Sequence, residues 1–155
     1  MTTIHDDLGS LDDWLLQQGI EQAEREVSIE DQLIPETVKG LGQPHVYLYA
    51  TVIFDGEVAN GGLQQFFENA SGALAPTVRD ALREMTLGHY ASLMTQIINA
   101  FGLDYPVDQW ARVTTIEKDP VLQEMLERSG DTIDVWSSEF ILARTHYARK
   151  HNLMK

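Results

Sequence analysis

The sequence contains no cysteine, so disulfides and thiolate chemistry are both excluded. Basic residues are also scarce: 11 Lys and Arg stand against 24 Asp and Glu, and the formal net charge is −13. The phosphate backbone of DNA or RNA requires a basic protein surface. The composition therefore argues against direct nucleic-acid binding.

Long apolar runs are missing as well. The most apolar segment, residues 45–54, is about half as long as a membrane-spanning helix needs to be. The first ten residues have neither the basic start nor the apolar stretch of a signal peptide. We therefore expect a cytoplasmic protein with no membrane partner. With no repeat or linker in its 155 residues, the chain is expected to form one domain, residues 1–155.

The acidic residues are concentrated near the N-terminus. Residues 1–36 contain ten acids and one base, Arg25, so these acids cannot all be paired locally. Solubility alone explains many acidic surfaces, because net charge keeps chains apart. The excess nevertheless makes this end the first candidate for a partner-binding surface. Its candidate residues are Asp6, Asp7, Asp12, Asp13, Glu21, Glu24, Glu26, Glu30 and Asp31.

A second acidic cluster lies in the last third of the chain. It comprises Glu117, Asp119, Glu124, Glu127, Asp131 and Asp134. Part of it has local explanations: Asp119 and Asp131 are expected near helix N-termini, where the helix dipole favours negative charge by about 0.3–1 kcal/mol. Glu124 and Arg128 are spaced as an i,i+4 pair. This cluster is therefore a secondary candidate.

Apolar spacing in the N-terminal half predicts helices. A helix over roughly 11–27 is expected to open with a capping box from Ser10 to Asp13. Residues 35–44 are predicted to be a loop or a frayed turn. Residues 45–54 have the composition of a strand but no partner strand, and Pro44 suits a first helical position. A buried helix is therefore favoured there.

The C-terminal half also has helical periodicity. One helix is predicted after Pro76, a second running to Gly102, and a third from Pro120 to Ser129-Gly130. A long last helix is expected from about Asp131. Its predicted inner stripe is Ile133, Trp136, Phe140, Ala143 and Tyr147. The fold class is therefore all-α, a single compact helical domain of about seven or eight helices.

Residues 56–72, GEVANGGLQQFFENASG, contain adjacent glycines that require an explanation. No Lys-Ser or Lys-Thr follows them, as in a phosphate-binding loop, and the three spaced glycines of a dinucleotide fingerprint are missing. Gly61 and Gly62 are better interpreted as the turn between two helices, with Asn60 capping the second. Three side chains are expected to hydrogen-bond across this turn to backbone groups: Gln64, Gln65 and Asn69.

This stretch resembles the hallmark motif of a bacterial family of unknown-function domains that includes a DNA-mimic protein. The similarity is specific in the motif and looser over residues 45–150. The sequence departs from the family pattern at Leu63, where Phe is usual. The matching residues are Gly56, Glu57, Val58, Asn60, Gly61, Gly62, Gln65, Phe66, Phe67, Asn69, Ser71 and Gly72.

The resemblance implies a helical fold, a homodimer and no known catalysis. For the DNA-mimic member it implies an acidic surface that occupies the DNA-binding face of a transcription factor. Residues 45–150 would then form the family-like core, preceded by an acidic N-terminal helical segment, residues 1–40. The function hypothesis is a non-enzymatic acidic binding protein whose partner is a basic DNA-binding protein.

Other function classes remain open. No His-Glu-x-x-His or Gly-x-Ser-x-Gly pattern is present, so we expect no catalytic residues, no metal and no cofactor. A hydrolase would need a deep polar pocket with a His inside. The alternative is a scaffold or immunity-type protein that recognises its partner by apolar contacts. Its candidate anchors, if exposed, are Trp110, Trp136 and Tyr147.

Overall fold

The computed structural model describes residues 7–25 and 33–155, with the side chains of 22–25 excepted. Within these ranges the chain forms eight α-helices and one 3-10 helix, and no strand, which confirms the predicted all-α class. The elements are α1 (Leu8–Arg25), α2 (Glu36–Lys39), α3 (Gln43–Glu68), η1 (Ala70–Leu74), α4 (Ala75–Glu84), α5 (Gly88–Ala100), α6 (Gln109–Lys118), α7 (Pro120–Thr132) and α8 (Ser138–Lys150).

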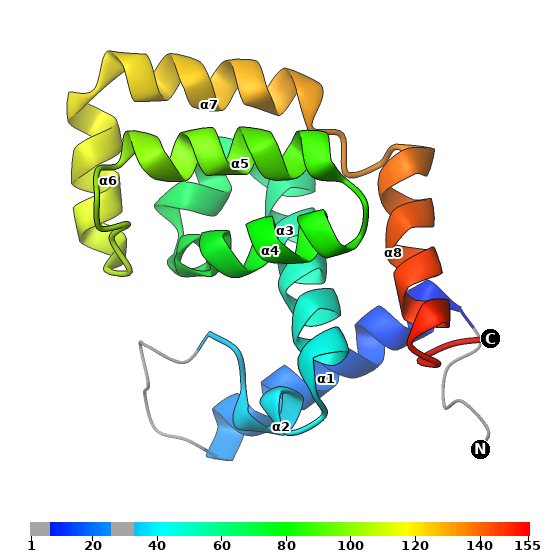
Figure 1. Ribbon diagram of the computed structural model, residues 1–155. Coiled ribbons are helices and arrows are strands. Elements are labelled where there is room, and N and C mark those ends of the chain that lie inside the picture. Colours follow the sequence, from blue (N-terminus) through cyan, green and yellow to red (C-terminus); the bar gives the residue numbers. More distant parts are fainter. Residues whose placement is uncertain (1–6, 26–32) are drawn as a thin grey trace.

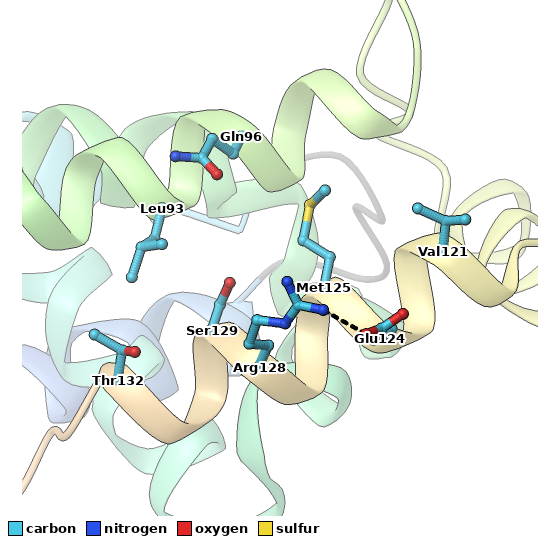
Figure 2. A pocket seen from close by; sticks show the side chains of 8 residues that line it. All are labelled: Leu93, Gln96, Val121, Glu124, Met125, Arg128, Ser129 and Thr132. Carbon is cyan, nitrogen blue, oxygen red and sulfur yellow. Dashed lines mark hydrogen bonds and ion pairs between the residues drawn. The ribbon is translucent and has the colours of Figure 1, made fainter.

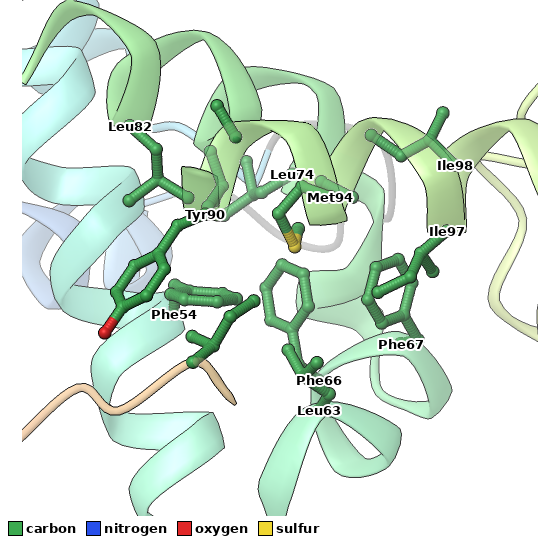
Figure 3. Packing of buried hydrophobic residues seen from close by; sticks show 14 of the residues in the cluster. Phe54, Leu63, Phe66, Phe67, Leu74, Leu82, Tyr90, Met94, Ile97 and Ile98 are labelled. Atoms are coloured by element: carbon green, nitrogen blue, oxygen red, sulfur yellow. The ribbon is translucent and has the colours of Figure 1, made fainter. Parts of the chain in front are cut away.

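Helix α3 is the centre of the arrangement. Figure 1 shows it running through the middle of the molecule, with α1 and α2 beside its first half and α4 beside its second half. Helices α5 and α7 pack against one another, and α8 contacts both α1 and α3. The backbone of every described helix except α5 comes close to that of α3. Helix α5 reaches α3 through side chains such as Met94 and Ile97, which lie beside Phe66 and Phe67 (Figure 3). The other helices are therefore positioned largely by α3.

Two apolar clusters form the core. In the larger one, side chains of α4, α5 and α7 pack with Phe54, Phe66 and Phe67 of α3. Figure 3 shows the α4 and α5 side chains Leu82, Met94 and Ile97 beside these rings. The Phe54 and Phe66 rings lie edge to face with centroids 5.0 Å apart, a geometry that aromatic pairs prefer. The smaller cluster joins Leu15 of α1 and Tyr147 of α8 to the first half of α3. Because α3 contributes to both clusters, its shape fixes how they are joined.

The N-terminal boundaries differ from those predicted. Helix α1 begins at Leu8, and the cap is Asp7, whose Oδ1 accepts a hydrogen bond from the Ser10 amide at 2.7 Å. The predicted capping box from Ser10 to Asp13 is therefore wrong, because Asp7 offers the same cap one turn earlier. The predicted end of that helix and residues 26–32 lie outside the described residues. The predicted loop over 35–44 contains the short helix α2, which buries Val38.

The proline and glycine signals were more reliable. The predicted buried helix over 45–54 is confirmed as part of α3, with Pro44 in its first turn. Pro76 lies in the first turn of α4, Pro120 is the first residue of α7, and Gly102 follows α5 with a φ of 113°. These residues mark ends because proline cannot donate within a helix and glycine adopts a positive φ.

The boundary between the last two helices was predicted incorrectly. Helix α7 continues past Ser129-Gly130 to Thr132, and α8 begins only at Ser138, where the Ser137 Oγ accepts from the Phe140 amide at 3.1 Å. Asp131 therefore ends α7 instead of opening α8. Trp136 precedes α8 and is 72% exposed, so it does not belong to the inner stripe, whereas Phe140 is buried. Because Ser137 caps a new helix, residues 133–136 do not share the helical periodicity of α8 that the apolar spacing suggested.

Candidate functional site

The glycine pair bends α3 into two halves. Gly61 has φ −148° and Gly62 has φ 77°, both outside the helical range, which agrees with the predicted turn between two helices. Only glycine adopts the conformation of Gly62 without strain. A Cβ on Gly61 would lie 1.9 Å from the Gln65 Oε1, so that position also needs glycine unless Gln65 moves. The bend therefore depends on both residues.

The carboxylate of Glu57 organises the bend, although the sequence analysis did not predict it as a site residue. The Oε2 of Glu57 accepts hydrogen bonds from the Gln65 Nε2 at 2.8 Å and the Asn69 Nδ2 at 2.9 Å. Its Oε1 accepts from the Ser71 Oγ at 3.2 Å. Asn60 was expected to cap the second half of α3, but its Nδ2 donates to the Gln65 Oε1 at 3.3 Å. These polar motif residues thus bind one another across the bend.

A buried arginine fixes the end of α3. Arg112 of α6 is fully buried, and its Nε and Nη2 donate to the carbonyls of Phe67 and Asn69 at 2.9 and 2.7 Å. Its Nη1 donates to the carbonyls of Pro106 and Val107 at 2.9 and 2.6 Å. The last carbonyls of a helix lack partners within it, so the guanidinium satisfies them. Burial lowers the pKa of Arg112, although nearby acidic groups oppose that shift.

The glycine that ends the motif explains the close approach of this arginine. A Cβ on Gly72 would lie 2.7 Å from the Arg112 Nε and 2.8 Å from the carbonyls of Phe66 and Phe67. The Gly72 carbonyl accepts from the Tyr105 hydroxyl at 2.6 Å. Burial raises the pKa of Tyr105 well above its usual range. The predicted helix end at Ser71-Gly72 is in fact η1, which links α3 to α4.

A second buried arginine joins α1 to α8. The Nη1 and Nη2 of Arg144 donate to the Oδ2 and Oδ1 of Asp12 at 2.8 and 2.7 Å, and its Nε donates to the Thr51 Oγ1 at 2.9 Å. The side chains of Arg144 and Asp12 are only 2% and 14% exposed. Burial raises the pKa of the neighbouring Asp55, while Arg144 opposes that shift. Asp12 therefore faces the protein interior, unlike a surface contact.

The remaining N-terminal candidates divide into three groups. Asp7 caps α1, Asp13 is exposed and Glu21 is partly exposed. Glu24 lies in α1, but its side chain is not among those described. Outside the described residues lie Asp6, Glu26, Glu30 and Asp31.

The second acidic cluster lies mostly along α7. Asp119 caps this helix by accepting from the amides of Val121 and Leu122, both at 3.1 Å, and Glu124 pairs with Arg128. Both roles were predicted. The Asp134 Oδ1 accepts from the Trp136 amide at 2.9 Å. Within this cluster, the exposed carboxylates that form no ion pair with a described residue are Glu117, Glu127, Asp131 and Asp134.

The two acidic clusters do not form one surface. Figure 1 shows α1 and α7 at opposite ends of the molecule, and the two helices make no contact.

A family model described as DMP19-like protein matches residues 39–151, more than two thirds of the chain. The chain belongs to the DMP19-like protein family. Searches of curated proteins and of solved structures returned no match. The DMP19-like range begins at the end of α2, so it contains α7 and the Gly61-Gly62 bend but leaves out α1.

A shallow groove lies between α5 and α7 of the DMP19-like domain. It has a volume of about 250 Å³, and its walls include Leu93, Met125 and Ser129, with the pair of Glu124 and Arg128 on the α7 side (Figure 2). No histidine lines it. Among the described side chains, no group of three His, Asp or Glu converges as a metal site would require.

The apolar anchors of the alternative hypothesis are only partly accessible. Trp110 and Trp136 are 71% and 72% exposed, whereas Tyr147 is buried at 5%. Trp110 lies in α6, before α7, and Trp136 lies between α7 and α8. None of the helices in residues 7–25 and 33–155 has the length and apolar character needed to span a membrane.

Proposed function

We propose that this DMP19-like protein is a non-enzymatic acidic binding protein that acts as a DNA mimic. It would occupy the DNA-binding surface of a basic protein such as a transcription factor and so compete with DNA. Family membership over residues 39–151 is the observation that carries the proposal, because the resemblance described above implies a family with a DNA-mimic member. The proposal assigns no catalytic residue, metal or cofactor.

The carboxylates of α7 suit such a surface. Glu124, Glu127 and Asp131 are exposed and follow one another at i, i+3 and i+7, so they lie toward one side of the helix. Seven residues of helix rise about 10 Å, which is close to the axial rise of three nucleotide steps along one DNA strand. Only Glu124 is offset by a local base, Arg128. Because α7 lies inside the family range, this row is a candidate contact for the partner.

The N-terminal acids are a second proposed contact. Asp13 and Glu21 of α1 are at least partly exposed, and the formal charge of residues 1–36 is strongly negative. Burial of Arg112 and Arg144 also removes two of the 11 basic side chains from the surface. A basic partner would therefore meet a surface with few cations. Association of this kind is steered by charge and weakens as salt rises.

The test is capture of proteins from a host lysate on the immobilised chain, followed by elution with salt or with competing duplex DNA. We expect a DNA-binding protein that both treatments release. Two variants then compare the clusters: Asp13→Asn with Glu21→Gln on α1, and Glu127→Gln with Asp131→Asn on α7. Asp12 is left unchanged, because its substitution would leave the buried Arg144 without its ion pair and so lower the stability of the fold. Arg83→Gln, in an exposed ion pair on α4, is the control for surface substitution as such.

Loss of partner affinity in either acidic variant, with an unchanged unfolding temperature, would support that cluster as the contact. A partner that resists salt and ignores DNA would overturn the proposal and point to recognition by apolar contacts. The resemblance also implies a homodimer, and light scattering of the purified chain would measure its mass in solution.

A further inference from the structure

The bend in α3 leaves a shallow hollow on the surface. Its lining residues come from both sides of the glycine pair and are Asn60, Gly61, Gln64, Gln65, Glu68 and Asn69. No basic residue and no large apolar residue takes part. The hollow is open because two glycines occupy its turn, and a Cβ on Gly61 would collide with Gln65. The residues that make the bend thus also create a polar depression.

The carboxylate of Glu57 determines the orientation of two of these amides. A carboxylate only accepts hydrogen bonds, so an amide beside it must present its NH2 group. Gln65 and Asn69 both donate to the Glu57 Oε2, at 2.8 and 2.9 Å. Their carbonyl oxygens are therefore directed away from Glu57. The amide nitrogen of Asn60 is in turn used on the Gln65 Oε1, which leaves the Asn60 oxygen as an acceptor.

The rim of the hollow carries a negative charge. Glu68 accepts from the Gln64 Nε2 through its Oε1 at 2.8 Å, so its second oxygen remains an acceptor. The amide nitrogens of Asn60, Gln64, Gln65 and Asn69 are all engaged in hydrogen bonds inside this cluster. One N–H of each amide is thus used inside the cluster, and the Glu68 carboxylate is the one charged group among the residues that line the hollow. The chemical complement of the hollow is a cation with several N–H donors.

We propose that this acceptor hollow binds an arginine side chain of a basic polypeptide. The guanidinium is planar, carries five N–H donors and is weakly hydrated, so it can meet several separated oxygens at once. A lysine ammonium would reach fewer of them. That the polypeptide is the DNA-binding partner rests on the proposed function. The hollow would then supply a specific contact in addition to the diffuse attraction of the acidic helices.

The site can be tested without that partner. The ¹⁵N-labelled full chain is titrated with acetyl-Gly-Arg-Gly-amide and with the same peptide containing citrulline, which has the shape of arginine but no charge. We expect the arginine peptide to shift the side-chain amide signals of Asn60, Gln64, Gln65 and Asn69. The citrulline peptide should bind at least about threefold more weakly, because charge-assisted hydrogen bonds are about twice as strong as neutral ones.

Two variants and one control complete the test. Glu68→Gln removes the charge but keeps the shape, and it should weaken arginine binding about three- to tenfold. Gln64→Ala alters an exposed wall of the hollow and should weaken binding even if Glu68→Gln proves unstable. Glu127→Gln removes the same charge from α7, outside the hollow, and should change binding little.

Three results would overturn the proposal: no shift of these amide signals, equal binding of the two peptides, or equal weakening by Glu127→Gln and Glu68→Gln. None of them depends on capture of a DNA-competed partner. Failure of the DNA-mimic proposal and failure of the acceptor hollow can therefore be told apart.

Discussion

Replacing Arg112 by methionine tests whether a buried guanidinium holds the end of α3. Methionine keeps an unbranched chain of similar length but has no donor, so the carbonyls of Phe67, Asn69, Pro106 and Val107 lose their hydrogen bonds. An unsatisfied buried polar group costs about 1–3 kcal/mol. Removal of the desolvation penalty of a buried charge offsets part of that sum. We expect a net loss of about 3–5 kcal/mol in the free energy of unfolding.

Lysine at the same position is expected to lose about 2–3 kcal/mol, because one ammonium cannot reach all the carbonyls that are spread around the edges of the guanidinium. Urea denaturation measures both changes. Slopes for small proteins are about 1–3 kcal/mol per molar urea, so Arg112→Met should lower the midpoint by about 2 M. Arg83→Met is the matched control, since the Arg83 side chain is 61% exposed, and a change within about 0.5 kcal/mol is expected there.

An Arg112→Met variant within about 1 kcal/mol of the original protein would refute this reasoning. It would mean that water or local rearrangement satisfies the four carbonyls just as well.

Three further predictions concern glycine and ionisable residues. Gly72→Ala should lower the unfolding temperature, because the new Cβ would lie 2.8 Å from two backbone carbonyls. Gly56→Ala should raise the unfolding temperature, because nothing lies near that Cβ and alanine has a higher helix propensity, worth up to about 1 kcal/mol. Equal effects of the two substitutions would contradict this reasoning. Burial raises the pKa of Asp55 above 3.8, so the folded state holds that proton more tightly and this group's contribution to stability falls as pH rises through that range. Asp55→Asn should therefore raise the unfolding temperature near pH 7, a gain that disappears near pH 3 in thermal melts. Burial raises the pKa of Tyr147 from 10.0 to about 12, so stability should fall between those pH values, and Tyr147→Phe should make that decline shallower in alkaline denaturation curves.

The sequence was sufficient for the fold class and for the position of the bend, because both depend on local signals. Apolar periodicity predicted the helices, and Gly61-Gly62 predicted the interruption of α3. Boundaries were less certain where two caps compete, as Asp7 does with Ser10. The segment between α7 and α8 was misassigned because Ile133 and Trp136 continue an apolar spacing that the backbone does not follow.

The buried arginines could not be predicted from the sequence. Arg112 and Arg144 lie on amphipathic helices, where an arginine is normally exposed. Their burial depends on acceptors 43 and 132 residues away in the chain, for example Asn69 and Asp12. The same limit applies to Glu57, whose central role becomes visible only when Asn69 and Ser71 fold back toward it. Asp12 was accordingly grouped with the surface acids, although it is an internal partner.

The ion pair between Asp12 and Arg144 has a consequence for folding during synthesis. On the ribosome, α1 emerges long before α8. Asp12 can therefore pair with Arg144 only after more than a hundred further residues have been translated. Until then α1 can pack only against α2 and α3. The smaller apolar cluster would therefore be completed only when the finished chain is released and α8 packs against α1 and α3, which makes this a late step of folding.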